Sequence, residues 1–338
     1  MTEPAPRTSV PIIDLTGASA EHPPAPVVDG IGTAAAELGF FQVVGHGIPD
    51  RLIAEVWAMT RAFFALPAAT KRSLQRTREN SRGYYDRELT KNRRDRKEVL
   101  DIAQVPFPEA GDDDPRNHQP VDGRNQWPDL PGFRDTMVAY LAACESLSLD
   151  LLAAFSVGLG ERPDRLREHF GPGHSSFVRL NHYPLDDPLT AAESAAVTPL
   201  GDMALHHHSD AGALTVLLQD EVGGLQVMDG DRWIDVPPIP GALVINTGDM
   251  MQVWSNDRYR AALHRVRPIT DRARLSLPYF FNPSYGTDYA PLPGSIATGD
   301  VAHYRSINWG DFRQARADGD YADYGAEIQI SDFRTVGG

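Results

Sequence analysis

Four histidines and one aspartate in the second half of the chain could together hold a metal ion. Three of the histidines are consecutive, His206, His207 and His208, and Asp210 stands two residues after the last of them. Residues two apart on an extended chain point to the same side, so His208 and Asp210 are expected to converge. His264 lies in an apolar run that can form a neighbouring strand and complete the set. Two imidazoles and one carboxylate on one face of an octahedral transition metal leave its other positions open.

A second pair of residues could bind a carboxylate. Arg274 and Ser276 are also two apart in an apolar run, so their side chains are expected to share a face. A planar guanidinium beside a hydroxyl can hold both oxygens of a carboxylate.

A facial set of two histidines and one carboxylate is the arrangement of non-haem Fe(II) oxygenases. Taken alone, three consecutive histidines are as compatible with a solvated surface run.

The elements that must position these residues are short strands. From about residue 172 onward, short apolar runs alternate with turn residues. This pattern predicts an antiparallel double-sheet barrel or jelly roll. The turn Asp229-Gly230-Asp231 predicts a hairpin. The runs span residues 177–180, 214–218, 225–227, 233–236, 242–245, 252–254, 261–266 and 274–281.

The first half of the chain reads as helices with a few strands, so we expect an α+β protein. Apolar spacing predicts helices over residues 27–38, from Asp50 onward and over 133–157, and strands over 10–15 and 40–44. Residues 108–131, rich in Asp, Pro and Gly, predict a surface loop. One more helix is expected over residues 309–317.

Longer segments resemble the isopenicillin N synthase-like branch of the Fe(II)/2-oxoglutarate dioxygenases. The similarity covers residues 9–290 in the same order. It is carried by HSDAGALTVLLQDEVGGLQV (208–227), NTGDMMQVWSNDRYRAALHRV (246–266), RLSLPYFFNP (274–283), VPIIDL (10–15), ELGFFQVVGHGIP (37–49), RGYY (82–85), DRKEVLD (95–101) and NHYP (181–184).

This resemblance implies a role for each matching position. The implied iron ligands are His208, Asp210 and His264. The implied partners of 2-oxoglutarate are Arg274 and Ser276 at its distal carboxylate, with Tyr183 and Asn181 beside it. His206 and His207 depart from the family pattern, and the sequence assigns them no role.

For the substrate, the resemblance points to residues 82–101 and to the last barrel strand. The candidates are Arg82, Tyr85, Arg87 and Phe281. Residues 82–101 hold seven basic and five acidic side chains, so the alternative is a self-paired structural segment.

The resemblance also implies a fold and an activity. The fold is a double-stranded β-helix (jelly roll) core with an N-terminal helical region and a C-terminal helix. The implied regions are residues 9–125, a connecting helix over 126–171, the oxygenase core over 172–290 and an extension over 291–338. The implied reaction oxidises an unactivated C–H bond of a small molecule, most often by hydroxylation, with desaturation or cyclisation as other outcomes. Fe(II), 2-oxoglutarate and O2 are required, ascorbate can stimulate, and succinate and CO2 are released.

Other interpretations remain open or fail on particular residues. Related oxidases that use no 2-oxoglutarate keep the same Arg-x-Ser pair, and a non-catalytic binding module could keep the fold. The His-x-His-x-Asp-His pattern of metallo-β-lactamase-like hydrolases needs a histidine where Ala211 stands. The glycines Gly30 and Gly32 mimic a dinucleotide fingerprint, but no buried strand precedes them.

Composition restricts the partners and the location. The chain has 338 residues and a net charge of −14, which disfavours nucleic acid and anionic membrane surfaces as partners. Its single cysteine, Cys144, excludes an intrachain disulfide. We see no apolar run near the roughly 18 residues that span a bilayer and no leader pattern. We therefore expect a cytoplasmic monomer acting on a small molecule, whose identity the sequence does not indicate.

Overall fold

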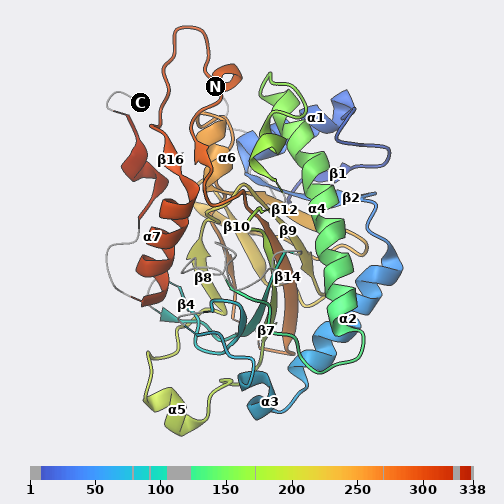
Figure 1. Cartoon of the computed structure of the whole chain (residues 1–338), viewed down its shortest axis with the longest axis vertical. Helices are drawn as coiled ribbons and strands as arrows, with labels where there is room; N and C mark the ends of the chain where they lie inside the picture. The colour runs from blue at the N-terminus through green and yellow to red at the C-terminus, as the bar shows by residue number, and fades with distance from the viewer. Residues whose placement is uncertain are drawn as a thin grey trace.

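The computed structural model is a mixed assembly of helices and sheets (Figure 1). It describes residues 9–77, 80–90, 93–104, 123–171, 173–268, 270–322 and 328–335. The polar tail before residue 9, Lys91, and the expected loop as far as residue 122 lie outside the described residues.

The larger sheet has eight strands and joins the two halves of the chain. Neighbouring strands are antiparallel except for the parallel pair β1 and β2. In spatial order the strands are β1 (Ile12–Asp14), β2 (Phe40–Val44), β12 (Leu243–Thr247), β9 (Leu214–Gln219), β14 (Arg274–Phe281), β7 (Phe177–Tyr183), β6 (Glu98–Ala103) and β3 (Gly83–Tyr85).

The smaller sheet has four strands, and the described strands form separate sheets rather than one closed barrel. The expected hairpin is confirmed, because Asp229 pairs with Arg232 across the turn. In spatial order the strands are β11 (Arg232–Asp235), β10 (Leu225–Asp229), β13 (His264–Val266) and β8 (Leu205–His208). Two further two-stranded sheets complete the described strands: β4 (Leu89–Thr90) with β5 (Arg93–Arg94), and β15 (Asp288–Tyr289) with β16 (Ile307–Asn308).

Helices cover the larger sheet on one side and the pocket region on the other. Figure 1 shows α4 on one flank of the sheets and α7 on the opposite flank. The helices are α1 (Ala25–Glu37), α2 (Asp50–Phe64), α3 (Ala68–Arg72), α4 (Phe133–Gly158), α5 (Ala191–Ala195), α6 (Asp249–Trp254) and α7 (Trp309–Ala322). Short 3-10 turns occur at Leu166–His169, Pro293–Ser295 and Ile330–Phe333.

Strand alternation divides the apolar residues between two cores. On β9, Leu214, Val216 and Leu218 belong to the core under α1, α2 and α4. Leu217 belongs to a second core that includes residues of both sheets, and Thr215 lines the pocket. The two faces of one strand therefore serve packing and chemistry separately, as the period of two requires.

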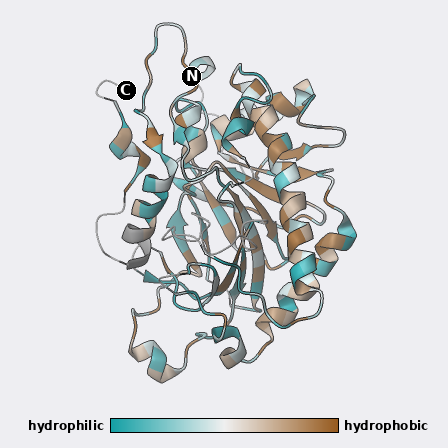
Figure 2. Ribbon diagram, in the orientation of Figure 1, coloured by the Kyte–Doolittle hydropathy of each residue, from teal (hydrophilic) through white to brown (hydrophobic). Residues whose placement is uncertain are grey.

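Helix α4 is long and apolar enough to cross a membrane by length and composition alone, contrary to the expectation from the sequence. The apolar 18-residue stretch of this helix is 56% buried, however. Leu141, Leu151 and Phe155 of the helix belong to the core. Figure 2 shows this helix with both apolar and polar residues along its length. These properties are those of the core helix of a globular protein, which passes the same test.

Two local predictions were wrong or incomplete. Residues 252–254, expected as a strand, belong to helix α6, in which Met250, Met251, Val253 and Trp254 are all buried. A fully buried apolar run lacks the periodicity that separates helix from strand. Strand β6 was not expected, because its Glu98 reads as a surface residue although it is buried against Lys71.

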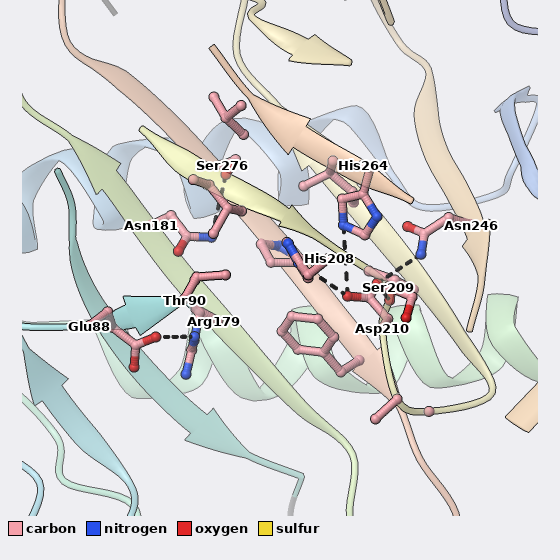
Figure 3. Close-up of a pocket in the computed structure, with 18 of the residues that line it drawn as sticks. Glu88, Thr90, Arg179, Asn181, His208, Ser209, Asp210, Asn246, His264 and Ser276 are labelled. Atoms are coloured by element: carbon pink, nitrogen blue, oxygen red, sulfur yellow. Dashed lines mark hydrogen bonds and ion pairs between the residues drawn. The ribbon is translucent and has the colours of Figure 1, made fainter. Parts of the chain in front are cut away.

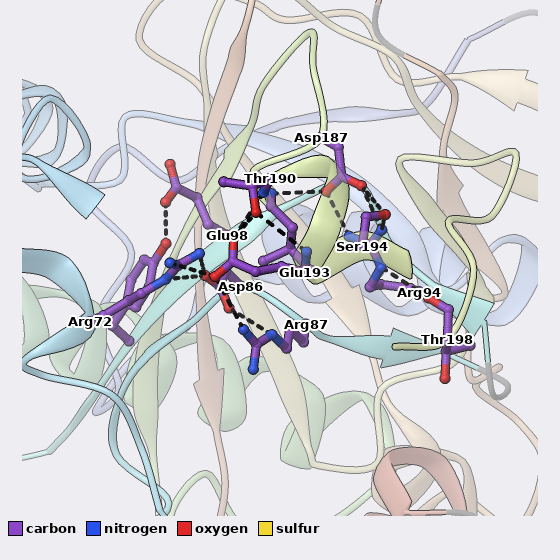
Figure 4. Close-up of polar contacts among 12 residues, drawn as sticks. Arg72, Asp86, Arg87, Arg94, Glu98, Asp187, Thr190, Glu193, Ser194 and Thr198 are labelled. Atoms are coloured by element: carbon purple, nitrogen blue, oxygen red, sulfur yellow. Dashed lines mark hydrogen bonds and ion pairs between the residues drawn. The ribbon is translucent and has the colours of Figure 1, made fainter. Parts of the chain in front are cut away.

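Ion pairs add to strand pairing and apolar packing in holding the described part of residues 82–101 against the rest of the chain (Figure 4). Arg94 is fully buried, and its Nη1 and Nη2 donate to the two oxygens of Asp187 at 2.7 and 2.6 Å. Arg72 contacts both Asp86 and Glu193. This segment is thus a paired structural unit that closes one side of the pocket.

The Arg94–Asp187 pair predicts a pH-dependent stability. Hydrogen bonds from Arg94 lower the pKa of Asp187 to about 2. A carboxyl with a depressed pKa adds stability above its unfolded value, near pH 4, and loses it as the pH falls toward the folded value. We expect Asp187→Asn to lower the free energy of unfolding by up to about 2 kcal/mol at neutral pH. Urea titrations of both proteins should show this difference constant above about pH 5 and shrinking below it. A difference that does not vary with pH would contradict the assignment.

Candidate metal centre and pocket

Strand pairing brings the two candidate histidines together. In the antiparallel pair β8–β13, His208 stands directly opposite His264, and the ring centroids are 4.3 Å apart. Asp210 lies in the loop just after β8, so the extended chain expected through residue 210 ends at His208. Its Oδ1 is 3.7 Å from His208 Nε2 and 3.8 Å from His264 Nε2 (Figure 3). One ion with bonds of about 2.1 Å can bridge such separations.

Hydrogen bonds orient the two imidazole rings and determine which ring nitrogen of each faces the cluster. His208 Nδ1 donates to the carbonyl of His206 at 2.9 Å, and His264 Nδ1 donates to that of Ala262 at 3.0 Å. A carbonyl can only accept, so Nδ1 carries the hydrogen in both rings, and Nε2 is the atom that a neutral imidazole would offer to a metal.

The carboxylate of Asp210 is oriented in the same way. Its Oδ2 accepts hydrogen bonds from Thr215 Oγ1 at 2.5 Å and from Asn246 Nδ2 at 2.7 Å. These bonds turn Oδ1 toward the imidazoles, and Figure 3 shows the contact with Asn246. Sequence reasoning missed both partners, because Thr215 and Asn246 come from β9 and β12 and carry no motif of their own.

The surroundings set the charge of each group. Burial, reinforced by the neighbouring His264, lowers the pKa of His208 to about 3. Burial alone would raise the pKa of Asp210, but the imidazoles of His264 and His208 and the bonds to its Oδ2 lower it overall. Near pH 7 the cluster therefore offers an unprotonated imidazole at His208 and a carboxylate at Asp210.

The other two histidines of the run point elsewhere. His206 Nδ1 is 3.0 Å from Asp95, and its Nε2 is 3.3 Å from Asp202. The hydrogen bond to Asp95 raises the pKa of His206 despite its burial. His207 is exposed. Of the three, the structure brings His208 alone into the cluster with Asp210 and His264.

Four predicted co-substrate residues meet on adjacent strands. In the pair β7–β14, Arg274 stands opposite Tyr183, and Ser276 stands opposite Asn181. Arg274 Nη1 donates to Ser276 Oγ at 3.1 Å, and Asn181 Nδ2 donates to the same oxygen at 3.4 Å. The guanidinium also lies 5.1 Å from the centre of the Tyr183 ring.

Arg274 is a buried cation without an ion pair. Its side chain is part of a residue only 1% exposed, and its Nε has no hydrogen-bond partner. Within the described part of the chain no carboxylate lies within ion-pair distance of it. Asn181 Oδ1 is likewise buried without a partner. Since an unpaired buried charge is costly, this end of the pocket is built for an anion.

The triad and the Arg274 cluster line one cavity of about 160 Å³. None of the four predicted substrate residues lines it. Arg82 is buried over the Phe177 ring, Tyr85 stacks with Arg76, and Arg87 lies near Asp86 and Glu193. Phe281 points away from the cavity and stacks on Phe170 at 4.1 Å.

Alternation explains which residues reach the cavity instead. Arg274, Ser276, Pro278 and Phe280 on β14 share the face toward it, so Phe280 and not Phe281 is the lining residue. That signal was present in the sequence. Further lining residues come from elsewhere in the chain: Lys97, Phe177, Arg179, Trp309, Arg313 and Arg316. Only the fold could indicate those on α7.

Two family descriptions match the chain. Residues 10–130 match the N-terminal region described as non-haem dioxygenase in morphine synthesis. Residues 174–283 match the 2OG-Fe(II) oxygenase superfamily. A feruloyl CoA ortho-hydroxylase of Ipomoea batatas is 32% identical over 311 residues, covering 90% of this chain and 79% of that protein. The chain belongs to the 2OG-Fe(II) oxygenase superfamily.

Other relatives of this oxygenase include a fungal protein and solved structures. A 2-oxoglutarate-Fe(II) type oxidoreductase of Emericella nidulans is 34% identical, covering 80% of this chain and 77% of that protein. The crystal structure of JOX2 in complex with 2OG, Fe and JA has a TM-score of 0.74 at 29% identity, covering 92% of this chain and 87% of that one. A dioxygenase for auxin oxidation in rice has a TM-score of 0.71 at 26% identity, covering 97% and 100%.

These findings confirm the family and the activity class expected from the sequence. This oxygenase is an oxidoreductase that uses Fe(II), 2-oxoglutarate and O2. They favour this interpretation over an oxidase that uses no 2-oxoglutarate, because the named relatives include hydroxylases and 2-oxoglutarate-Fe(II) oxidoreductases.

Proposed function

We propose that this oxygenase hydroxylates a C–H bond of a small, largely apolar molecule. His208, Asp210 and His264 would hold Fe(II), and Arg274 with Ser276 would hold the distal carboxylate of 2-oxoglutarate. The two sheets then correspond to the double-stranded β-helix of the family, with the N-terminal helices and α7 added to it.

The observation that carries the proposal is the pairing state of Arg274. It is a fixed, buried guanidinium with a neighbouring hydroxyl, and none of the described residues supplies its counter-ion. A dicarboxylate that reaches from the metal to this cation would neutralise it, and a guanidinium–carboxylate pair is a strong charge-assisted interaction. The donor set of the triad, two neutral nitrogens and one carboxylate oxygen, fits a ferrous ion.

The chain's own residues would bind the metal and the co-substrate, orient the metal ligands and exclude water from the cavity. Thr215 and Asn246 hold Asp210 with Oδ1 toward the imidazoles, and the carbonyls of His206 and Ala262 hold the two rings. When bound, Fe(II) and 2-oxoglutarate would activate O2, which is the oxidant: one oxygen atom would enter succinate as 2-oxoglutarate loses CO2, and the other would enter the C–H bond of the substrate. Phe177, Phe280 and Trp309 line the remaining cavity and would place an apolar substrate beside the metal.

The printed names of the relatives indicate the substrate only as a broad chemical class. Their printed names include a feruloyl CoA ortho-hydroxylase and a dioxygenase for auxin oxidation. Those names have in common small aromatic or apolar organic groups, and we propose that the substrate of this oxygenase belongs to the same broad class.

The test is coupled turnover of the purified, iron-loaded protein. Aromatic acids and their coenzyme A thioesters, including feruloyl CoA, are incubated with 2-oxoglutarate and isotopically labelled O2. We expect succinate and a product containing one labelled oxygen atom in equal amounts, and no product without 2-oxoglutarate. Calorimetry should also show 2-oxoglutarate binding to the iron-loaded protein. Undiminished turnover without 2-oxoglutarate, or the absence of 2-oxoglutarate binding, would contradict the proposal.

A further inference from the structure

The cations around the cavity differ in how they are paired. Five basic side chains line it, Lys97, Arg179, Arg274, Arg313 and Arg316. Lys97 Nζ lies 3.2 Å from Asp95, so its charge is balanced within the fold. Arg179 donates to both oxygens of Asp101 at 2.7 Å and to Glu88 at 3.0 Å. Neither group needs a ligand to balance it.

The remaining three cations differ in whether a partner within the fold balances their charge. Arg274 faces the proposed 2-oxoglutarate site. Arg316 is 5% exposed, lies 3.8 Å from Asp249, and donates to the carbonyls of Ile328 and Ser209. Arg313, by contrast, is partly buried and forms no hydrogen bond or ion pair with any part of the chain that the structure describes.

Arg313 is also held in place by its helix. Trp309 and Arg316 lie four residues before it and three after it, so all three share one side of α7. The indole Nε1 of Trp309 donates to Ser175 Oγ at 2.9 Å. Arg316 Nη2 donates at 3.3 Å to the carbonyl of Ser209, the residue between His208 and Asp210. These two contacts fix the helix over the cavity and give the Arg313 backbone a defined position near the candidate metal ligands.

We propose that Arg313 binds the carboxylate of the substrate, so that the substrate is a small organic acid whose apolar body lies against Phe177 and Phe280. The inference rests on the proposed function, because it assumes that Arg274 is occupied by 2-oxoglutarate. A guanidinium matches the two oxygens of a carboxylate. A polyphosphate-bearing thioester would call for several unpaired cations, whereas Arg313 is the one cation among the described lining residues that is left without a partner once Arg274 is occupied.

The experiment measures binding rather than turnover. Protein loaded with Fe(II) and 2-oxoglutarate under nitrogen is titrated calorimetrically with a panel of small aryl and alkyl carboxylic acids, each paired with its primary amide. Coenzyme A and the matching thioesters form a third arm. The proteins compared are the wild type, Arg313→Gln, Arg313→Lys and Arg162→Gln, the last removing an equal charge from a side chain that is 72% exposed.

We expect at least one acid to bind the wild type at least tenfold more tightly than its amide. Arg313→Gln should remove that preference, Arg313→Lys should restore part of it, and Arg162→Gln should leave it unchanged. The proposal is overturned if Arg313→Gln keeps the preference, if no acid in the panel binds better than its amide, or if only the coenzyme A arm depends on Arg313. The last outcome would assign the residue to a phosphate. Binding of 2-oxoglutarate is measured first on each sample, and its absence in the wild type would instead indicate that the proposed function fails.

Discussion

Replacement of His208 by alanine is expected to abolish both iron binding and product formation. The variant keeps one imidazole and one carboxylate, Nε2 of His264 and Oδ1 of Asp210, and two ligands hold Fe(II) too weakly for turnover. The loss of iron affinity should exceed the roughly 10–100-fold that follows when only an outer partner of a metal ligand is removed. Metal content after anaerobic desalting, together with calorimetric iron titration, measures the effect. His264→Ala should behave in the same way.

The matched control is the neighbouring residue of the same run. His207 is exposed, so His207→Ala should bind iron as the wild type does. Circular dichroism and thermal unfolding of each variant separate loss of the metal from loss of the fold. Iron retained by His208→Ala but lost from His206→Ala would show that the ligand assignment is shifted by two residues.

Replacement of Arg274 by alanine is expected to raise the KM for 2-oxoglutarate at least about 100-fold, with iron binding unchanged. The substitution removes the buried guanidinium and leaves the distal carboxylate of the co-substrate without a charged partner. Loss of one partner of a buried charge pair costs about 2–5 kcal/mol, and each 1.4 kcal/mol corresponds to about a tenfold change in affinity. Initial rates of succinate formation over a range of 2-oxoglutarate concentrations provide the measurement.

A control arginine lies two residues earlier in the chain. The side chain of Arg272 is 58% exposed and pairs with Glu221 on the surface, so Arg272→Ala should leave the KM for 2-oxoglutarate within about twofold of the wild type. Arg274→Lys, which keeps the charge but not the planar fork, should fall between the wild type and alanine. If Arg274→Ala keeps the wild-type KM, the co-substrate lies elsewhere in the cavity.

The candidate site was predictable where its residues carry local patterns. His208 and Asp210 are two apart, as are Arg274 and Ser276, and spacing of this kind defines a shared direction before any fold is known. The same rule would have selected Phe280, which shares the face of Arg274, in place of Phe281. Strand β6 and helix α6 were not predictable in this way, because buried ion pairs and complete burial remove the polar–apolar alternation on which sequence patterns depend.

The sequence by itself determined the family, the residue types of the candidate metal ligands and a core of short strands arranged in two sheets. These features depend on residue identity and on patterns that repeat every few residues. Only the tertiary structure decided which distant groups meet. The opposition of His208 and His264 follows from the register of β8 against β13, and the orientation of Asp210 depends on Asn246 from β12. The placement of Arg313 at the cavity depends on how α7 packs. Strand register and helix docking are set by the free energy of the whole core, to which every buried residue contributes, and no short window of sequence contains that sum.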